Sequence, residues 1–165
     1  MSTKVLVSDT NIWIDLHHGG LLELVLQLPF EFVTTDFVHH ELRQPPGADL
    51  VNLGLQVVEL SGQEVTGLYA LRGKLGNSSL ADVSCYYVAD KQGWTLLTGD
   101  GALRKSGKAA NLDVRGTLWL IDQLFERKLL DGRHLAESLQ AILDCGARLP
   151  DAECETRIEA WAGEN

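Results

Sequence analysis

Four acidic residues, Asp9, Glu41, Asp82 and Asp100, are the side chains of this 165-residue chain best suited to metal chemistry. Asp9 follows the apolar run VLVS and Asp100 follows WTLLTG, so both are expected just beyond the carboxyl ends of strands. Glu41 and Asp82 lie in TDFVHHELR and SSLADVSCYYVA, which are expected to be helical. Carboxylate oxygens are the ligands that Mg²⁺ and Mn²⁺ prefer.

Each acid taken alone has a simpler interpretation. Asp is a favoured helix N-cap, and Asp9 and Asp100 both precede helical sequence. Asp82 completes an S-x-x-D pattern that begins at Ser79 and is typical of a capping box. Glu41, which is too far from the start of its helix to cap it, is more simply a solvated residue on a helix face.

The four acids together favour a different interpretation. Two of the acids follow parallel strands, and the other two lie on the helices between those strands. Acids in these positions can converge on one edge of a sheet, where ligands bind in open α/β folds. Two carboxylates about 4 Å apart repel by roughly 4 kcal/mol at an effective dielectric constant of about 20. A bound Mg²⁺ or Mn²⁺ would remove that cost, and a metal-activated water can attack phosphorus in line.

The elements that must position these acids alternate along the chain between short β-branched runs and helical segments. This alternation predicts an α/β fold with a parallel sheet. Strands are expected at about 5–8, 30–34, 56–60, 95–98 and 112–115. Helices are expected at about 11–18, 21–27, 36–43, 63–75, 80–92, 101–108, 117–127, 133–144 and 151–161, with a turn-rich break at 44–50.

The length and composition indicate one globular domain. We divide it into residues 1–130, which carry the alternating pattern, and a helical C-terminal extension, residues 131–165, packed on the same domain. The chain has no apolar run long enough for a membrane span and no signal-peptide core, which predicts a cytoplasmic protein without a membrane partner.

The formal net charge of −9 argues against nucleic-acid binding by bulk electrostatics. A local basic patch is still expected in residues 101–130, which hold six basic and three acidic residues. Arg104 and Lys105 lie one turn after Asp100, where they can meet a phosphate near a metal. A solvated helix face is an equally good interpretation of these two residues.

The ordered acidic motifs resemble those of PIN-domain nucleases. The matching segments are DTNIWIDL at Asp9, HHEL at Glu41, LADVSCYYVA at Asp82 and LLTGDGAL at Asp100. The resemblance covers about residues 5–130, and the ordered set is more specific than any one motif. It implies a three-layer α/β/α sandwich with a parallel, Rossmann-like central sheet, followed here by C-terminal helices.

The resemblance also implies a function. It implies a Mg²⁺- or Mn²⁺-dependent endoribonuclease that cleaves single-stranded or structured RNA, with Asp9, Glu41, Asp82 and Asp100 as catalytic and metal-binding acids. Asn11 and Thr98 would be polar neighbours that orient water or a carboxylate. Many small PIN proteins are toxins of type II toxin–antitoxin pairs, so an antitoxin partner and a homodimer are expected by the same resemblance.

Two features of the chain are more typical of stand-alone PIN proteins. These are the helical tail after residue 130 and the segment VRGTLWLIDQL. Two other functions also remain open at this point: a PIN-fold binding or regulatory protein that does not cleave, and a structure-specific DNA nuclease. Nothing in the sequence reads a 2′-hydroxyl, so the RNA preference comes from the resemblance.

Overall fold

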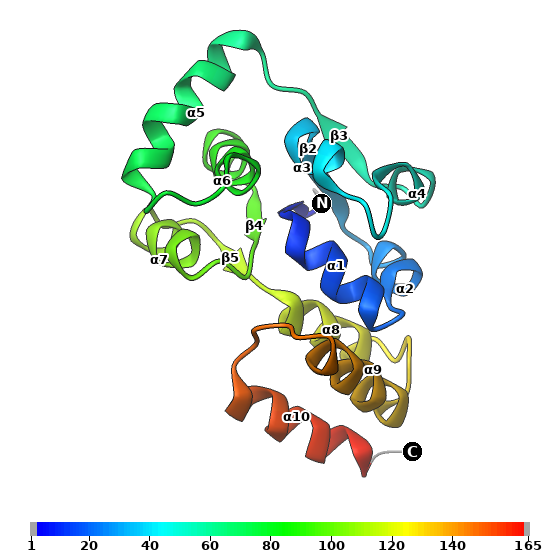
Figure 1. The fold of residues 1–165 in the computed structure, drawn as a ribbon. Coiled ribbons are helices and arrows are strands. Elements are labelled where there is room, and N and C mark those ends of the chain that lie inside the picture. Colours follow the sequence, from blue (N-terminus) through cyan, green and yellow to red (C-terminus); the bar gives the residue numbers. More distant parts are fainter. Residues whose placement is uncertain (1–2, 164–165) are drawn as a thin grey trace.

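Five strands form the centre of the fold, and the computed structural model describes residues 3–163. The strands are β1 (Val5–Ser8), β2 (Glu31–Thr35), β3 (Gln56–Val58), β4 (Thr95–Leu97) and β5 (Val114–Arg115). They form one sheet in the order β3-β2-β1-β4-β5, and every neighbouring pair is parallel (Figure 1). The predicted parallel sheet is confirmed, and each strand end lies within two residues of its expected position.

The strand order contains one reversal of direction, between β1 and β4. From β1 the chain builds outward through β2 to β3, then returns to the other side of β1 to add β4 and β5. In open α/β sheets, the crevice outside the carboxyl ends of the strands at such a switch point is where ligands bind. The topology therefore directs attention to the residues that follow β1 and β4.

Ten helices connect and cover the strands within residues 3–163. They are α1 (Thr10–His18), α2 (Leu22–Leu26), α3 (Asp36–Glu41), α4 (Gly47–Asn52), α5 (Gly62–Lys74), α6 (Leu80–Gln92), α7 (Gly101–Ala109), α8 (Thr117–Glu126), α9 (Gly132–Asp144) and α10 (Asp151–Ala162). Helix α4 was not predicted, because its segment was interpreted as part of a turn-rich break. Pro46 is instead the N-cap residue, with extended backbone, and Gly47 begins the helix.

The helices lie on both faces of the sheet and make it the middle layer of an α/β/α sandwich (Figure 1). Helix α6 packs on β1, β2 and β4 and is itself flanked by α5 and α7. Helices α1, α2 and α8 pack together on the other side. The apolar runs of β1 and β4 are buried between these layers, as expected for parallel strands covered on both faces.

The C-terminal helices pack on the outside of this second helical layer. Helix α9 contacts α1 and α8, and α10 packs along α9. The approach is close, because a Cβ added at Gly19 would lie 2.8 Å from Cδ1 of Ile142. The buried Trp161 ring stacks on Phe125 with a centroid distance of 5.5 Å. Residues 131–163 thus share a hydrophobic core with the sheet, while the division at residue 130 stays a prediction.

Within the described residues, no helix combines the length and the apolar character that crossing a membrane requires.

Candidate active site

Asp9 lies at the switch point, directly after β1, and its carboxylate is fixed by two hydrogen bonds. Oδ1 accepts the backbone N–H of Ile12 at 3.1 Å, which caps α1. Oδ2 accepts the hydroxyl of Thr98, which follows β4, at 2.5 Å. The residue is only 1% exposed. Asp9 therefore has the capping role that its sequence position suggests, and in addition it contacts the neighbouring strand.

Thr98 connects Asp9 to the second acid of the switch point, Asp100. Its hydroxyl oxygen also accepts the backbone N–H of Asp100 at 3.1 Å, so one side chain bonds to both residues. The Asp100 carboxylate caps α7 by accepting the N–H of Leu103 at 2.9 Å. The hydroxyl of the buried Ser78 lies 3.4 and 3.5 Å from its two oxygens. Asp9 and Asp100 are thereby held at one edge of the sheet.

Glu41 reaches the same edge from helix α3. The hydroxyl of Thr10 donates to Oε2 of Glu41 at 2.5 Å, and Thr10 is the residue next to Asp9. Glu41 is the last residue of α3 and remains exposed to solvent. Glu41, in the HHEL segment, thus lies beside the first turn of α1. The Thr10 bond holds one of its carboxylate oxygens and so restricts the orientation of the other.

Asp82 lies in the first turn of α6, close to the other three acids. Its backbone N–H donates to the hydroxyl of Ser79 at 3.1 Å, as the capping pattern predicts. Among the described residues, its carboxylate makes no return bond to the backbone N–H of Ser79, so the capping box is only half formed. The carboxylate is held by the Ser79 side chain, whose hydrogen bond lowers the pKa of Asp82 and so opposes the effect of the neighbouring acids.

The electrostatics of Asp82 and Asp9 show that the acids repel one another. Burial, together with the negative charge of Asp82 and a smaller contribution from Asp15, raises the pKa of Asp9 to about 7, against the opposing hydrogen bonds from Thr98 and Ile12. Burial and the charges of Asp100 and Glu41 raise the pKa of Asp82 to about 6. These four residues, Asp9, Glu41, Asp82 and Asp100, are called the acid cluster below. Its ionised form is unfavourable without a positive partner.

No basic side chain supplies that partner. Six ion pairs form among the described residues, and none of them includes Asp9, Glu41, Asp82 or Asp100. Within residues 3–163, no three His, Cys, Asp or Glu side chains lie close enough together to enclose a metal ion. An open set of oxygen donors still fits Mg²⁺, which commonly uses a few carboxylates and completes its shell with waters and substrate phosphate.

Comparison with known proteins agrees with this arrangement. A family model described as a PIN domain (DUF3368) matches residues 5–163, nearly the whole chain and including α9 and α10. The chain belongs to the PIN-domain family. PIN domains are generally nucleases and generally use divalent metals. A search of curated proteins finds no match.

The remaining predicted residues of this PIN domain are distributed differently around the site. Thr98 orients a carboxylate, whereas Asn11 is exposed on α1 and makes no side-chain hydrogen bond among the described residues. The adjacent Thr10 makes the polar contact instead. Thr10 and Ser78 were not predicted. The only sequence signal for them was their position next to Asp9 and in the turn before α6.

Asp15 was also not predicted. It is half-buried on α1, six residues after Asp9, and accepts the hydroxyl of Thr117 at 3.3 Å. Burial raises its pKa, against the opposing effects of the Thr117 bond and of His18. Asp15 thus adds to the negative charge around Asp9 and contributes to its raised pKa.

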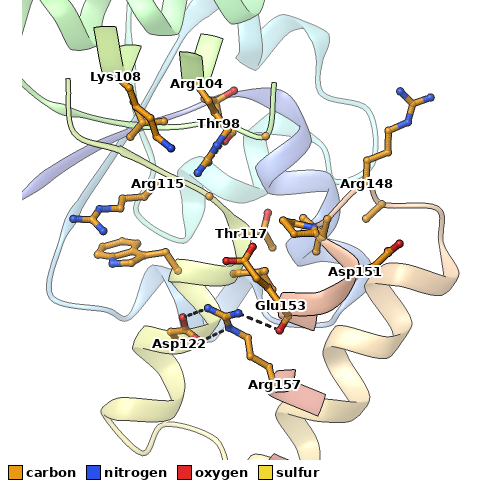
Figure 2. A pocket seen from close by; sticks show the side chains of 18 residues that line it. Thr98, Arg104, Lys108, Arg115, Thr117, Asp122, Arg148, Asp151, Glu153 and Arg157 are labelled. Carbon is orange, nitrogen blue, oxygen red and sulfur yellow. Dashed lines mark hydrogen bonds and ion pairs between the residues drawn. The ribbon is translucent and has the colours of Figure 1, made fainter. Parts of the chain in front are cut away.

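A cleft of about 1000 Å³ adjoins the acid cluster of the PIN domain and begins at Thr98 and Gly99. Arg104 lines it, and its guanidinium donates to the carbonyl oxygen of Thr98 at 2.9 Å. Figure 2 shows Arg104 and Lys108 on the upper side, with the bidentate pair of Arg157 and Asp122 below. Lys105 is exposed on α7 and is not part of the lining.

Proposed function

We propose that this PIN domain is a metal-dependent endoribonuclease that hydrolyses RNA phosphodiester bonds. The observation that carries the proposal is Asp9, a buried carboxylate that is fixed by Thr98, feels the charge of Asp82 and forms no ion pair within the part of the chain that the structure describes. An acid that served only as a helix cap would not need a second carboxylate beside it. The RNA preference is supported by the resemblance to PIN nucleases.

Asp9, Asp82, Asp100 and Glu41 would hold one or more Mg²⁺ or Mn²⁺ ions. When bound, such an ion lowers the pKa of a water, polarises the phosphoryl group and stabilises the departing oxygen. In the hydrolysis itself, the water oxygen forms a bond to phosphorus, the bridging P–O bond breaks and the departing oxygen gains a proton.

The protein's own contribution is to fix the acids before substrate arrives. The bonds from Thr98 and Ile12 determine the orientation of Asp9, and the cap to Leu103 determines that of Asp100. Thr10 restrains one oxygen of Glu41. Ligands held in this way lose little conformational freedom when a cation binds, which favours a correctly placed substrate.

The test is a titration of Mg²⁺ and Mn²⁺ that follows the melting temperature and the cleavage of a labelled single-stranded RNA together. Metal should raise the melting temperature of the wild-type protein and start cleavage. Asp9→Asn should lose at least about a hundredfold in cleavage rate, more than the loss of a residue that only orients a ligand. Asn is also a good helix cap, so the fold should remain.

Asp131→Asn is the matched control. Asp131 caps α9 through the N–H of His134 at 2.9 Å, as Asp9 caps α1, but it is exposed and stands apart from the acid cluster. It should therefore cleave as the wild type does. Full activity in Asp9→Asn would reject the proposal. Metal binding without cleavage of RNA or DNA would favour a PIN domain that binds but does not cut.

A further inference from the structure

The cleft beside the acids is continuous with them through a single residue. Thr98 bonds to Asp9 through its hydroxyl, accepts Arg104 through its carbonyl oxygen and lines the cleft. A ligand that fills the cleft therefore comes close to the acid cluster. The charges of these two neighbouring regions are opposite in sign.

The cleft concentrates positive charge in a protein whose net charge is −9. Five cationic and three anionic side chains line it, and the ion pair of Arg157 with Asp122 neutralises one of each. The cations left are Arg104, Lys108, Arg115 and Arg148, and the acids left are Asp151 and Glu153. Basic residues are thus gathered in one place in spite of the overall negative charge.

Most of these cations are available to a ligand. Lys108 and Arg148 form no ion pair and no side-chain hydrogen bond with any described residue. Arg104 donates to the neutral carbonyl of Thr98 and forms no ion pair with any residue in 3–163. Arg115 is paired with Asp113 at 2.9 Å, but Asp113 also pairs with Lys4 at 3.0 Å. One carboxylate therefore serves two cations.

The cations surround the cleft and do not converge on one point. Figure 2 shows Lys108 and Arg104 above, Arg115 on the left and Arg148 on the right. They come from α7, β5 and the segment between α9 and α10. Such spacing suits an extended polyanion better than a single phosphate, because successive phosphates can each meet a different cation.

Helix α10 and the segment before it supply the opposite wall. Arg157 on α10 binds both carboxylate oxygens of Asp122 on α8, at 2.8 and 2.7 Å, and so fixes α10 across the cleft. The volume of about 1000 Å³ is at the upper end of the range for small-ligand pockets. That space has room for a few nucleotides of one strand and not for a duplex.

We infer that this cleft binds the sugar-phosphate backbone of single-stranded RNA next to the scissile bond, with Arg104, Lys108 and Arg115 on phosphates. The inference rests on the proposed function for the identity of the polyanion. It assigns α10 and the segment before it a part in substrate binding, as one wall of the cleft that the RNA strand follows.

The test measures binding of a labelled oligouridylate by fluorescence anisotropy in EDTA, at several salt concentrations and in the Asp9→Asn background to prevent cleavage. The cleft variant is Lys108→Gln with Arg115→Gln. The matched control is Lys128→Gln with Arg133→Gln, which removes the same charges from exposed positions that do not line the cleft. Melting temperatures confirm that both variants fold.

The cleft variant should bind at least about tenfold more weakly, and its slope of log K against log salt should shrink by about 1.4, since each phosphate contact on a single strand contributes about 0.7. The control should bind like its parent, and a duplex of the same length should compete poorly. Equal binding by the cleft variant and the control, or preferred binding of duplex, would overturn the inference.

This inference and the proposed function can fail separately. Suppose that the wild type cleaves RNA, that the cleft variant binds like its parent, and that Lys108→Gln with Arg115→Gln in the wild-type background leaves the cleavage rate unchanged. That combination would reject the cleft inference and keep the proposed nuclease function. Binding of the oligouridylate that depends on the cleft residues, without cleavage by the wild type under any divalent metal, would support the cleft inference and reject the proposed nuclease function.

Discussion

The acid cluster and the basic cleft are neighbours in this PIN domain, yet they are built from different kinds of side chain. The acids are short, and Asp9 and Asp100 are fixed by backbone N–H groups at helix starts and by the hydroxyl of Thr98. The cations are long, and Lys108 and Arg148 extend from exposed positions. The first region is ordered before any ligand binds, whereas the second can adapt to a ligand.

The two regions also differ in what they cost the folded state. The raised pKa values of Asp9 and Asp82 mean that their ionised forms destabilise the fold at neutral pH. Exposed cations such as Lys108 are solvated and cost little. A cluster that destabilises its own fold is expected where function requires it. This difference supports the proposal that the acids perform the chemistry and that the cleft contributes affinity for RNA.

The largest expected effect separates these two roles at Asp82. Asp82→Asn should lower the cleavage rate by at least about a hundredfold, because it removes one of the proposed metal ligands. It should also bind single-stranded RNA at least as well as the wild type in EDTA, because a negative charge near the polyanion is lost. Single-turnover cleavage and anisotropy check the two parts; a parallel loss of binding would contradict the separation.

A second prediction concerns pH and the metal-free fold. The folded-state pKa of Asp9, about 7, lies above its unfolded value of 3.8, so the folded state holds more protons between these values. The free energy of unfolding should therefore increase by roughly 2 to 3 kcal/mol from about pH 8 to about pH 5, raising the melting temperature by about 5 to 10 °C.

Calorimetry in EDTA checks this prediction. Asp9→Asn should show a much smaller pH dependence, since its side chain does not titrate. Saturating Mg²⁺ should also reduce it, because the metal competes with the proton for the same carboxylates. A wild-type melting temperature that is constant between these pH values would mean that the pKa of Asp9 is not raised in the folded state.

The third prediction concerns the residue that joins the regions. Thr98→Val removes the hydroxyl that bonds to Asp9 and Asp100 while keeping the shape of the side chain. The cleavage rate should fall by about 10- to 100-fold, as for other residues that orient a metal ligand. Thr98→Ser should restore most of it. The slope of log K against log salt for RNA binding should stay unchanged, since no cation is lost. A changed slope would mean that Thr98 contributes to RNA binding in the cleft.

The smallest expected effect compares two lysines on helix α7. Lys108 lines the cleft, whereas Lys105, three residues earlier, is exposed outside it. Lys108→Gln should raise the KM for RNA by about three- to tenfold, the loss of one phosphate contact, while kcat changes little. Lys105→Gln should leave KM within twofold. A larger increase in KM for Lys105→Gln than for Lys108→Gln would mean that closeness to Asp100 in the sequence, and not a position in the cleft, determines which lysine contacts the RNA.

Much of this architecture could be predicted because it depends on local patterns. The buried strands appear as short apolar runs, and the starts of α1, α6 and α7 appear as Asp or Ser before helical sequence. Helix α4 was missed because proline and glycine in Gln44–Gly47 are typical of turns, whereas Pro46 and Gly47 here lie at a helix start.

The contacts that complete the site could not be predicted in the same way. Thr10 meets Glu41 across 31 positions, and Thr98 meets Asp9 across 89. No local pattern encodes such pairs, because they depend on how α3 and β4 pack beside β1. The choice between Lys105 and Lys108 is similar: both lie on α7, and only its packing determines which one lines the cleft.

The sequence by itself determined which residues can do chemistry and the order of the elements that carry them, because hydrophobic periodicity and capping preferences act over a few neighbouring residues. Only the tertiary structure decided that the switch point brings Asp9 to Thr98, that Asp82 faces acids without a basic partner, and that α10 closes a basic cleft beside them. Those features arise from the burial of surfaces between distant segments, and they exist only once the chain has packed.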